Sequence, residues 1–502
     1  MKQGKIWQAP TAEDQIVHDM HNVFEAGQRN HHISNTAYPI AHNTTWKAYK
    51  VKKSSHMDRV AQSFDGLDQF ALYSHIPFCE TRCYFCEYTV VGKSELDQTK
   101  LYMDNLEKEL DLYSAILGRR KLQGFDIGGG TPSFVSAELI DRHVNHVSKL
   151  FSFTDGFEIS IETTPKIAAA EPEKIAAYHA AGIRRISIGI QVTQPDLLKA
   201  LGREENGISH ISRAVEHIRR ANFDSFNIDL MYGFAGQSMQ SWEATLNYAI
   251  SLKPEYITLY RMRYKLTRIS SQAYQVEMAQ VLEQAALAKA LLTMAGYWAN
   301  PGKNTYSRIT DNTGTSAYLT GRVIQGAPYL GVGLGAQTFT DTTISYNSGA
   351  VGKNLTPYFK ALDKLEFPIQ DLYDLPAAHM MAKMVAVSFY FGEVNLAYFE
   401  NKFGVPFEQA YSAAIKYALD NELMAYTDSI NGFEFEQGTD LTYGKHNSKS
   451  FSLTEKGARH FNGTIALFFA PSVQSYLIDS DPLISDDFKK NESAAERIFA
   501  RG

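Results

Sequence analysis

Three cysteines in one short segment constrain this chain more than any other feature. Cys79, Cys83 and Cys86 are the only cysteines among 502 residues, and their spacing is C-x3-C-x2-C. Three thiols this close cannot pair into disulfides without leaving one over, and the short spacing suits chelation of one compact object. A structural zinc site normally takes four protein ligands, whereas an iron–sulfur cube held by three thiolates keeps one iron open. The segment therefore predicts a metal site, with a zinc knuckle or three unrelated buried cysteines as alternatives.

The composition limits the kind of protein that this chain forms. Hydrophobic residues make up 44% of it and charged residues 21%, which predicts a globular protein with an ample core. This length suits about three ordinary domains, or one large α/β barrel with appendages. Lysine and arginine number 49 against 55 acidic residues, and no run of about 18 apolar residues or apolar leader segment occurs. We expect a cytoplasmic protein with no nucleic-acid partner and no membrane span.

The order of apolar segments predicts the fold class. From residue 70 onward, short apolar runs alternate with longer amphipathic ones, which is the pattern of repeated βα units. We expect strands at 71–76, 123–127, 157–162, 185–190, 225–231 and 255–261. We expect helices at 95–117, 135–150, 170–181, 207–220, 238–252 and 272–295. These elements predict an α/β fold with a partial (β/α)6 barrel, in which functional residues gather at the C-terminal ends of the strands.

The cysteine segment also carries a family resemblance. HIPFCETRCYFC, residues 75–86, resembles the cluster motif of radical S-adenosylmethionine (SAM) enzymes, particularly the oxygen-independent coproporphyrinogen III dehydrogenase (HemN-like) family. The resemblance covers residues 65–345 well and the C-terminal part loosely. It implies a 4Fe-4S cluster held by Cys79, Cys83 and Cys86, with SAM chelated to the fourth iron. In that chemistry, an electron from the cluster splits SAM into methionine and a 5'-deoxyadenosyl radical, which abstracts a substrate hydrogen atom.

Residues at the expected strand ends match the SAM contacts of this family. The segment GGGTPS, residues 128–133, resembles the one that holds the amino group of SAM, although a tight βα turn would also use its glycines. Arg203 matches an arginine that pairs with the methionyl carboxylate through a guanidinium fork, and a surface arginine is the alternative. Asp229 with Gln191 would bind ribose hydroxyls, unless Asp229 is a structural acid. The candidate SAM contacts are Tyr73, Gly129, Gly130, Thr131, Glu162, Gln191, Arg203, Asp229, Met231 and Arg263.

Tyr73 is the candidate catalytic residue. It matches a tyrosine near the sulfonium of SAM in the resembling dehydrogenases, where an aromatic face or a phenol oxygen is electrostatically favourable. A core tyrosine in a barrel strand is the competing interpretation. Two departures from the family pattern bear on the reaction. Glu87 and Tyr88 stand where the dehydrogenases carry Gly-Cys, and the pair Arg261 and Arg263 would neutralise an anionic substrate or a second SAM, or form a salt bridge at the rim.

Three functions remain open at this point. The first is hydrogen abstraction from a tetrapyrrole or related carboxylate substrate, with flavodoxin or ferredoxin as electron donor. The second is a class C radical SAM methyltransferase or cyclopropanase that uses two SAM molecules on an aromatic or natural-product substrate. The third is a heme-binding chaperone without turnover, whose heme ligands would come from the early histidines. These are His18, His21, His31, His32, His42 and His56.

We expect three parts along the chain. Residues 1–65 form an N-terminal extension, residues 66–350 the barrel domain, and residues 351–502 a smaller, mainly helical C-terminal domain with winged-helix character. In the last part we expect helices near 385–398 and 406–422, and another that begins at Ser452 or Thr454 with Glu455. The acidic balance of the chain makes DNA binding improbable for this domain, so a lid over the substrate is the expected role.

Overall fold

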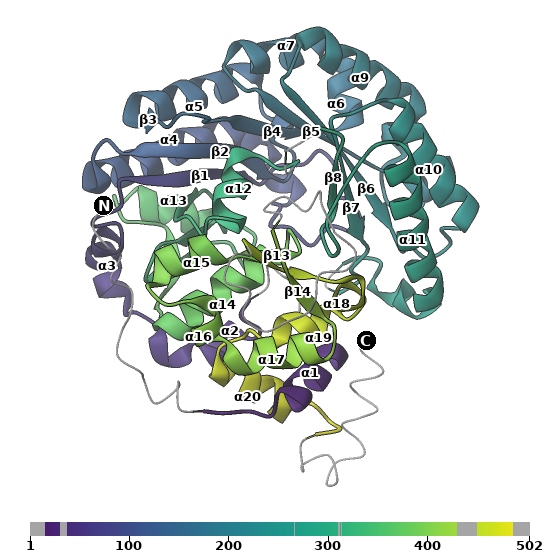
Figure 1. Ribbon diagram of the computed structural model, residues 1–502. Coiled ribbons are helices and arrows are strands. Elements are labelled where there is room, and N and C mark those ends of the chain that lie inside the picture. The colour runs from purple at the N-terminus through teal and green to yellow at the C-terminus, as the bar shows by residue number, and fades with distance from the viewer. Residues whose placement is uncertain are drawn as a thin grey trace.

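The fold is mixed α/β, with helices along the outer side of a curved sheet (Figure 1). The computed structural model describes residues 16–30, 38–265, 267–309, 312, 314–428 and 449–484. Six neighbouring strands run parallel, in the order β1 (Gln69–Ile76), β2 (Lys121–Gly129), β4 (Ile159–Thr163), β5 (Arg185–Gln191), β6 (Ser225–Tyr232) and β7 (Tyr256–Arg261). The predicted partial (β/α)6 barrel is confirmed. None of the described helices is both long and apolar enough to cross a bilayer.

The outer helices follow the predicted order, and two short helices at Pro165–Ala170 and Pro195–Ala200 were not predicted. The helix predicted at 170–181 begins at Pro172, because proline cannot donate the hydrogen bond that would continue the preceding helix. The segments predicted at 95–117 and 272–295 begin with 3₁₀ turns, at Lys93–Gln98 and Ser270–Gln275. The helices are α4 (Thr99–Leu117), α5 (Ala137–Leu150), α6 (Pro165–Ala170), α7 (Pro172–Ala180), α8 (Pro195–Ala200), α9 (Ile208–Ala221), α10 (Met239–Ser251) and α11 (Met278–Met294).

The sheet extends beyond the six predicted strands on both sides. β8 (Thr305–Ser307) pairs antiparallel with β7, and β9 (Tyr329–Val332) pairs parallel with β1. β10 (Gln337–Phe339), β11 (Thr343–Asn347) and β12 (Ile369–Asp374) continue the sheet antiparallel, and the two-residue β3 (Ser152–Phe153) pairs with β2. A Cβ atom on Gly331 would lie 2.2 Å from the carbonyl oxygen of Gln337. The glycine-rich segment at residues 326–336 therefore allows close backbone packing between β9 and β10.

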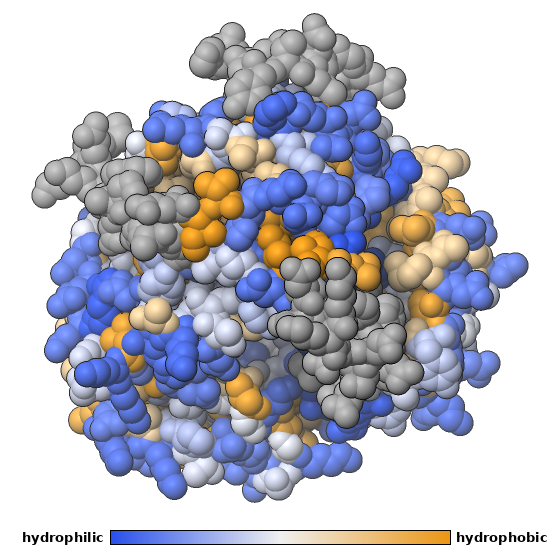
Figure 2. Space-filling view, turned by 90° about the horizontal axis from the view of Figure 1, so that it is seen from below, coloured by the Kyte–Doolittle hydropathy of each residue, from blue (hydrophilic) through white to orange (hydrophobic). Residues whose placement is uncertain are grey.

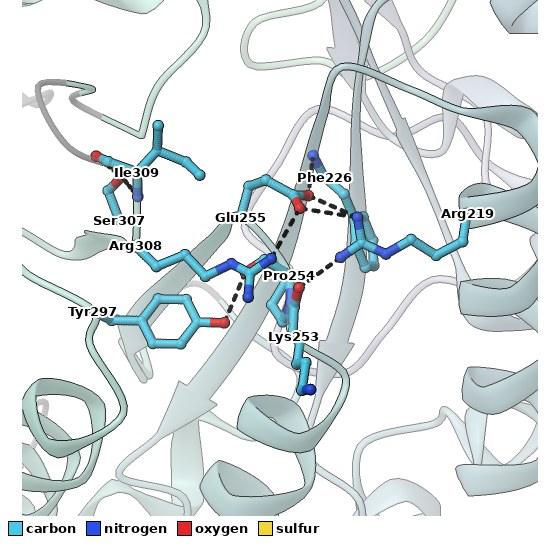
Figure 3. Close-up of polar contacts among 9 residues, drawn as sticks. All are labelled: Arg219, Phe226, Lys253, Pro254, Glu255, Tyr297, Ser307, Arg308 and Ile309. Carbon is cyan, nitrogen blue, oxygen red and sulfur yellow. Dashed lines mark hydrogen bonds and ion pairs between the residues drawn. The ribbon is translucent and has the colours of Figure 1, made fainter.

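A carboxylate at the N-terminal edge of the barrel joins three neighbouring elements. Glu255 accepts hydrogen bonds from Arg219 Nη1 at 2.9 and 3.0 Å, from Arg308 Nη2 at 3.4 Å and from the Phe226 backbone N–H at 3.2 Å (Figure 3). Arg219 comes from α9 and Arg308 follows β8, so one side chain ties the start of β7 to both neighbours. This network lies at the end of the strands opposite the cysteine loop, which begins after the C-terminal end of β1.

The C-terminal part is mainly helical, with a small antiparallel sheet. The predicted helix near 385–398 is wrong, because α14 (Ala377–Ser388) ends early and Gly392, with φ of 75°, leads into a strand. Thr454 caps α18 as expected, since its side chain accepts a hydrogen bond from the Gly457 N–H. The strands β13 (Glu393–Asn395), β15 (Ser450–Leu453) and β14 (Met424–Thr427) are adjacent in that order. The other helices are α15 (Leu396–Phe403), α16 (Phe407–Ala410), α17 (Ser412–Asp420), α18 (Glu455–Arg459), α19 (Phe461–Ala466) and α20 (Pro471–Ser480).

The N-terminal part shares a core with these C-terminal helices. α1 (Met20–Arg29) packs on α19 and α20, and a Cβ atom on Gly27 would lie 2.6 Å from the Cβ atom of Ala466. Tyr38 and Trp46 both hydrogen-bond to Nδ1 of His379, each at 3.0 Å. The barrel sheet also includes β12, which lies after the boundary predicted at residue 350. The three-part division of the chain stays a prediction. The remaining helices are α2 (His42–Thr45), α3 (His56–Ser63), α12 (Ala317–Val323) and α13 (Thr356–Leu362).

Glu109 on α4 is a buried carboxyl that fastens the glycine-rich segment to the barrel. It accepts hydrogen bonds from the Gly333 N–H at 2.8 Å, from Asn347 Nδ2 at 2.7 Å and from the Tyr358 hydroxyl at 2.6 Å. Burial raises its pKa from 4.5 to about 7. The folded protein therefore binds more protons than the unfolded chain between those pH values, and its stability falls as pH rises through that window.

We expect Glu109→Gln to remove this pH dependence, which is on the order of 3 kcal/mol in the free energy of unfolding. Relative to the unmodified protein, the variant should be more stable at pH 7 than at pH 5, because it has no buried carboxyl to ionise. Chemical denaturation at pH 5 and pH 7 measures both effects. Glu107→Gln is the matched control, since Glu107 lies on the same helix but pairs with Arg142. If the free energy of unfolding of the Glu109 variant depends on pH as strongly as that of the unmodified protein, the assignment is contradicted.

Candidate functional site

The three cysteines lie on the loop that follows β1, at the C-terminal end of the parallel strands. Cys79 Sγ is 3.3 Å from Thr131 Oγ1, at the end of β2. Arg203 Nη1 donates a hydrogen bond to Cys83 Sγ at 3.2 Å, and Arg82 Nη2 donates one to the carbonyl oxygen of Cys86 at 3.0 Å. The loop is therefore held by groups from two other parts of the barrel.

The donor set fits a cluster better than a single ion. Burial raises the pKa of Cys79 to about 12, and the neighbouring thiols act in the same direction. Among the described residues, no three His, Cys, Asp or Glu side chains are arranged to hold one metal ion. A cube binds each thiolate through a different iron, so the three sulfur atoms need not converge on one point. Three soft sulfur donors on one loop therefore suit an iron–sulfur cube.

The glycines after β2 are required by the approach of the cysteine loop. Gly129 has φ of 120°, and a Cβ atom there would lie 2.6 Å from the His75 ring. A Cβ atom on Gly130 would lie 2.7 Å from the Phe78 carbonyl oxygen and 3.1 Å from Cys79 Sγ. The N–H groups of Gly130 and Thr131 donate to carbonyl oxygens of the β1 end, at 2.8 and 2.7 Å. These two amides hold the loop in place and are not available to a ligand.

Buried polar atoms near the cysteines have no protein partner, among them Nε of Arg82 on the cysteine loop and one atom each of Arg203 and Gln191. Arg203, predicted as a SAM contact, is only 7% exposed, so a surface role is excluded. Two of its nitrogens bind Gly189 O and Cys83 Sγ, but its Nε is buried without a partner. Gln191 has φ of 68°, and its buried Oε1 is also without a partner. Orphaned polar atoms at one place indicate a polar ligand, because burying them unpaired is costly.

Two carboxyls lie with Arg203 and Gln191 at the C-terminal ends of the strands, and we call these four residues the rim. Asp229 on β6 accepts a hydrogen bond from Asn227 Nδ2 at 2.8 Å, and burial raises its pKa to about 6. Glu162 on β4 faces the cavity described below, and the surrounding protein together with Asp229 raises its pKa to about 8. The rim thus holds one guanidinium and two carboxyls whose charged forms are disfavoured without a partner.

Tyr73 points into the same region from β1. Its hydroxyl is 3.1 Å from His75 Nδ1, and His75 Nε2 lies 2.8 Å from the Thr89 carbonyl oxygen. Only a protonated Nε2 can donate to a carbonyl, and burial lowers the pKa of His75 to about 4, so the ring is neutral and Nδ1 accepts from Tyr73. Tyr73 also stacks on Tyr318, with ring centroids 5.8 Å apart. Tyr73 therefore packs against the neighbouring core and also lines the cavity described below.

The two departures from the family pattern meet each other. Arg263 Nε lies 3.7 Å from Glu87 Oε1, as the salt-bridge alternative anticipated. Tyr88 is 65% exposed although it lines the cavity, which makes its ring available to a ligand. No local pattern in the chain marks residues 87 and 263 as a pair.

All the predicted site residues surround one cavity of about 2360 Å³. Ligand pockets for drug-sized molecules usually measure roughly 300–1,000 Å³, so this cavity has room for more than one such ligand. Sequence reasoning missed the parts of its wall that come from distant segments, because no local pattern marks them. The cavity is lined by Cys79, Cys83, Cys86, Tyr73, Gly129, Gly130, Thr131, Glu162, Gln191, Arg203, Asp229, Met231 and Arg263, and also by Lys303, Arg322, Tyr390 and Arg459.

The early histidines lie elsewhere. His18 is 2.9 Å from Ser475 Oγ, His21 is 3.2 Å from the Tyr417 hydroxyl, and His56 is 3.2 Å from the Val51 carbonyl oxygen. His42 stacks on Tyr346. None of these four lines the cavity, and His31 and His32 fall outside the described residues.

Comparison with known proteins agrees with this geometry. The radical SAM superfamily matches residues 73–249. The heme chaperone HemW of Haemophilus influenzae is 34% identical over 241 residues, which cover 46% of this chain and 61% of that protein. The anaerobic coproporphyrinogen III oxidase 1 of Cereibacter sphaeroides is 33% identical over 207 residues, or 40% of this chain and 45% of that protein. The chain thus spans about half the length of these relatives.

A solved structure extends the likeness to nearly the whole chain. Coproporphyrinogen III oxidase (HemN) from Escherichia coli matches with a TM-score of 0.68 and 22% identity, over 91% of this chain and 99% of that one. Residues 73–249 are similar to the radical SAM superfamily, and the fold matches that of HemN. The superfamily implies a 4Fe-4S cluster and SAM, for which the cysteine loop and the unpartnered polar atoms supply suitable donors. The chain's relatives include both heme chaperones and coproporphyrinogen oxidases, so the family alone leaves the specific activity open.

Proposed function

We propose that this protein is an enzyme that cleaves SAM reductively and abstracts hydrogen from a tetrapyrrole or related carboxylate substrate. The observation that carries the proposal is the grouping, at one end of one cavity, of three thiols with the unpartnered Nε of Arg203 and Oε1 of Gln191. The printed names of the relatives, which concern heme and coproporphyrinogen, support the substrate class.

Each side chain has a role in this proposal. Cys79, Cys83 and Cys86 hold the cluster, which when bound supplies the electron for SAM cleavage. Arg203 binds the methionyl carboxylate through its free N–H, as charge-assisted pairing favours. Gln191 and Asp229 accept from the ribose hydroxyls, and Glu162 accepts from the amino group.

The remaining candidates shape the space in which the substrate reacts. Tyr73, held by His75, keeps its ring and hydroxyl beside the sulfonium, and Met231 packs at the end of β6. Gly129, Gly130 and Thr131 fix the cysteine loop against the strand ends. The cavity beyond them accommodates the substrate, while the C-terminal helices cover it and limit access of water. Flavodoxin or ferredoxin would deliver the electron.

Methyl transfer with a second SAM is the other candidate function. It is favoured by the cavity volume and by the Glu87–Arg263 pair, which stands where the related dehydrogenases carry different residues. Arg263 would then help to bind the second SAM or an anionic substrate once Glu87 is displaced.

Anaerobic reconstitution with iron, sulfide, SAM and a chemical reductant tests the proposal. We expect absorption near about 400 nm from the cluster and formation of 5'-deoxyadenosine, measured by mass spectrometry with coproporphyrinogen III as the first substrate. S-adenosylhomocysteine would indicate methyl transfer instead. Heme binding, seen in the Soret band, without either nucleoside product would indicate a chaperone and overturn the enzymatic proposal.

A further inference from the structure

A second arginine lines the cavity from a helix that carries none of the predicted site residues, and we call the part of the cavity around it the inner end. Arg322 belongs to α12, which packs against β1 and β2 inside the curve of the sheet (Figure 1). Its guanidinium carbon lies 4.7 Å from the centroid of the Tyr329 ring, and Nη1 donates to the Tyr318 hydroxyl at 3.4 Å. Its Nε is buried without a hydrogen-bond partner, and its nitrogens form no ion pair with any residue that the structure describes.

No carboxylate pairs with this arginine among the residues that the structure describes. Lys383 on α14 is a second cation, 1% exposed, whose Nζ donates to the Tyr38 carbonyl oxygen at 3.1 Å. Burial and Arg322 together lower the pKa of Lys383 to about 7. Asp126 interacts electrostatically with Arg322 but accepts hydrogen bonds from Ser160 and Ser316, both at 2.7 Å, and burial raises its pKa. A cation enclosed by phenols with no paired carboxylate is unfavourable unless a ligand completes it.

The shape of the site indicates what that ligand group is. Arg322, Tyr318, Tyr329 and Gln337 all line the cavity, whereas Lys383 lies behind them. The unpartnered N–H of a planar guanidinium favours a carboxylate, because charge-assisted hydrogen bonds to carboxylate oxygens are stronger than neutral ones. Tyr318 stacks on Tyr73, so this inner end adjoins the predicted SAM site.

We propose that Arg322 binds a carboxylate of a ligand at the inner end of the cavity. This inference rests on the proposed function, which supplies the probes. Two ligands of that function carry a carboxylate that Arg322 could bind. They are the side-chain carboxylates of a tetrapyrrole and the methionyl carboxylate of a second SAM. In either case Arg322 determines specificity, because a neutral ligand of the same shape gains nothing from it.

Equilibrium binding to the cluster-loaded protein tests this inference without requiring turnover. The probes are coproporphyrin III with its tetramethyl ester in mild detergent, and SAM with decarboxylated SAM. Arg322→Gln removes the charge while keeping an amide donor. Arg185→Gln is the matched control, since Arg185 also lies over a tyrosine ring, at 4.6 Å from Tyr256, and is 5% exposed, but does not line the cavity.

We expect Arg322→Gln to weaken one carboxylate probe about ten- to a hundredfold and to leave its neutral counterpart unchanged. Weaker coproporphyrin III binding identifies the substrate carboxylate, and loss of a second equivalent of SAM identifies the second cofactor. The ligand-free variant should melt no lower than the unmodified protein, because an unpaired charge has been removed from a mainly enclosed place.

If Arg322→Gln binds each of the four probes with the same affinity as the unmodified protein, the inference is overturned. A similar loss in Arg185→Gln, or a large drop in the melting temperature of ligand-free Arg322→Gln, would assign Arg322 a structural role and would also overturn it. Failure to form 5'-deoxyadenosine would instead count against the proposed function, since these binding measurements do not depend on SAM cleavage.

Discussion

Replacing Cys79, Cys83 or Cys86 with alanine is expected to abolish SAM cleavage and remove the absorption near about 400 nm. Each thiolate would bind a separate iron, and two thiolates leave the cube with an additional open site that favours its loss. The chain has no other cysteine to substitute. We expect 5'-deoxyadenosine to fall to the level of the reaction without protein, and iron and sulfide content to fall with it.

Glu80→Gln is the control for this prediction. Glu80 lies on the same loop, directly after Cys79, and pairs through its exposed carboxylate with Lys166 at 2.8 Å. This variant should keep its cluster and its activity. Full cluster content and cleavage in any of the three cysteine variants would contradict the assignment, and tightly bound zinc in the unmodified protein would point to the alternative metal.

Arg203→Gln is expected to weaken SAM binding about ten- to a hundredfold, because a charge-assisted hydrogen bond contributes roughly 1.5–3 kcal/mol. The SAM affinity of Arg203→Lys should lie between those of the unmodified protein and Arg203→Gln, since lysine keeps the charge but loses the planar fork. Isothermal titration of the cluster-loaded protein with SAM measures the effect.

Arg203 also contacts Cys83, so cluster content must be determined for each variant. We expect the absorption near about 400 nm to remain in both arginine variants. Lost absorption would mean that the arginine supports the cluster rather than SAM. Unchanged SAM affinity with an intact cluster would exclude the carboxylate contact.

The barrel and its rim could be predicted because their signals are local. Apolar runs bounded by glycine or proline identify buried parallel strands, and Cys79, Glu162, Gln191 and Asp229 follow directly from where those strands end. Arg203 was found by resemblance, and its burial could not be read from the sequence.

The additional strands could not be predicted for a physical reason. β8 and β10 are three residues long and contain threonine, serine or glutamine, and they exist because partners distant in sequence offer unpaired backbone groups. The same applies to the inner wall of the cavity, where Arg322 and Tyr390 arrive from α12 and from the end of α14. Non-local contacts of this kind leave no periodic pattern in the chain.

The shared core of the two ends of the chain sets an order of assembly during synthesis. Tyr38 and Trp46 meet His379, and Tyr38 also packs against Phe469, with ring centroids 5.0 Å apart. The ribosome must release residues beyond position 469 before α1 and its neighbours have partners, long after the cysteine loop has emerged. The barrel with its cysteine loop is therefore synthesised first, and the two ends of the chain can pack together only afterwards.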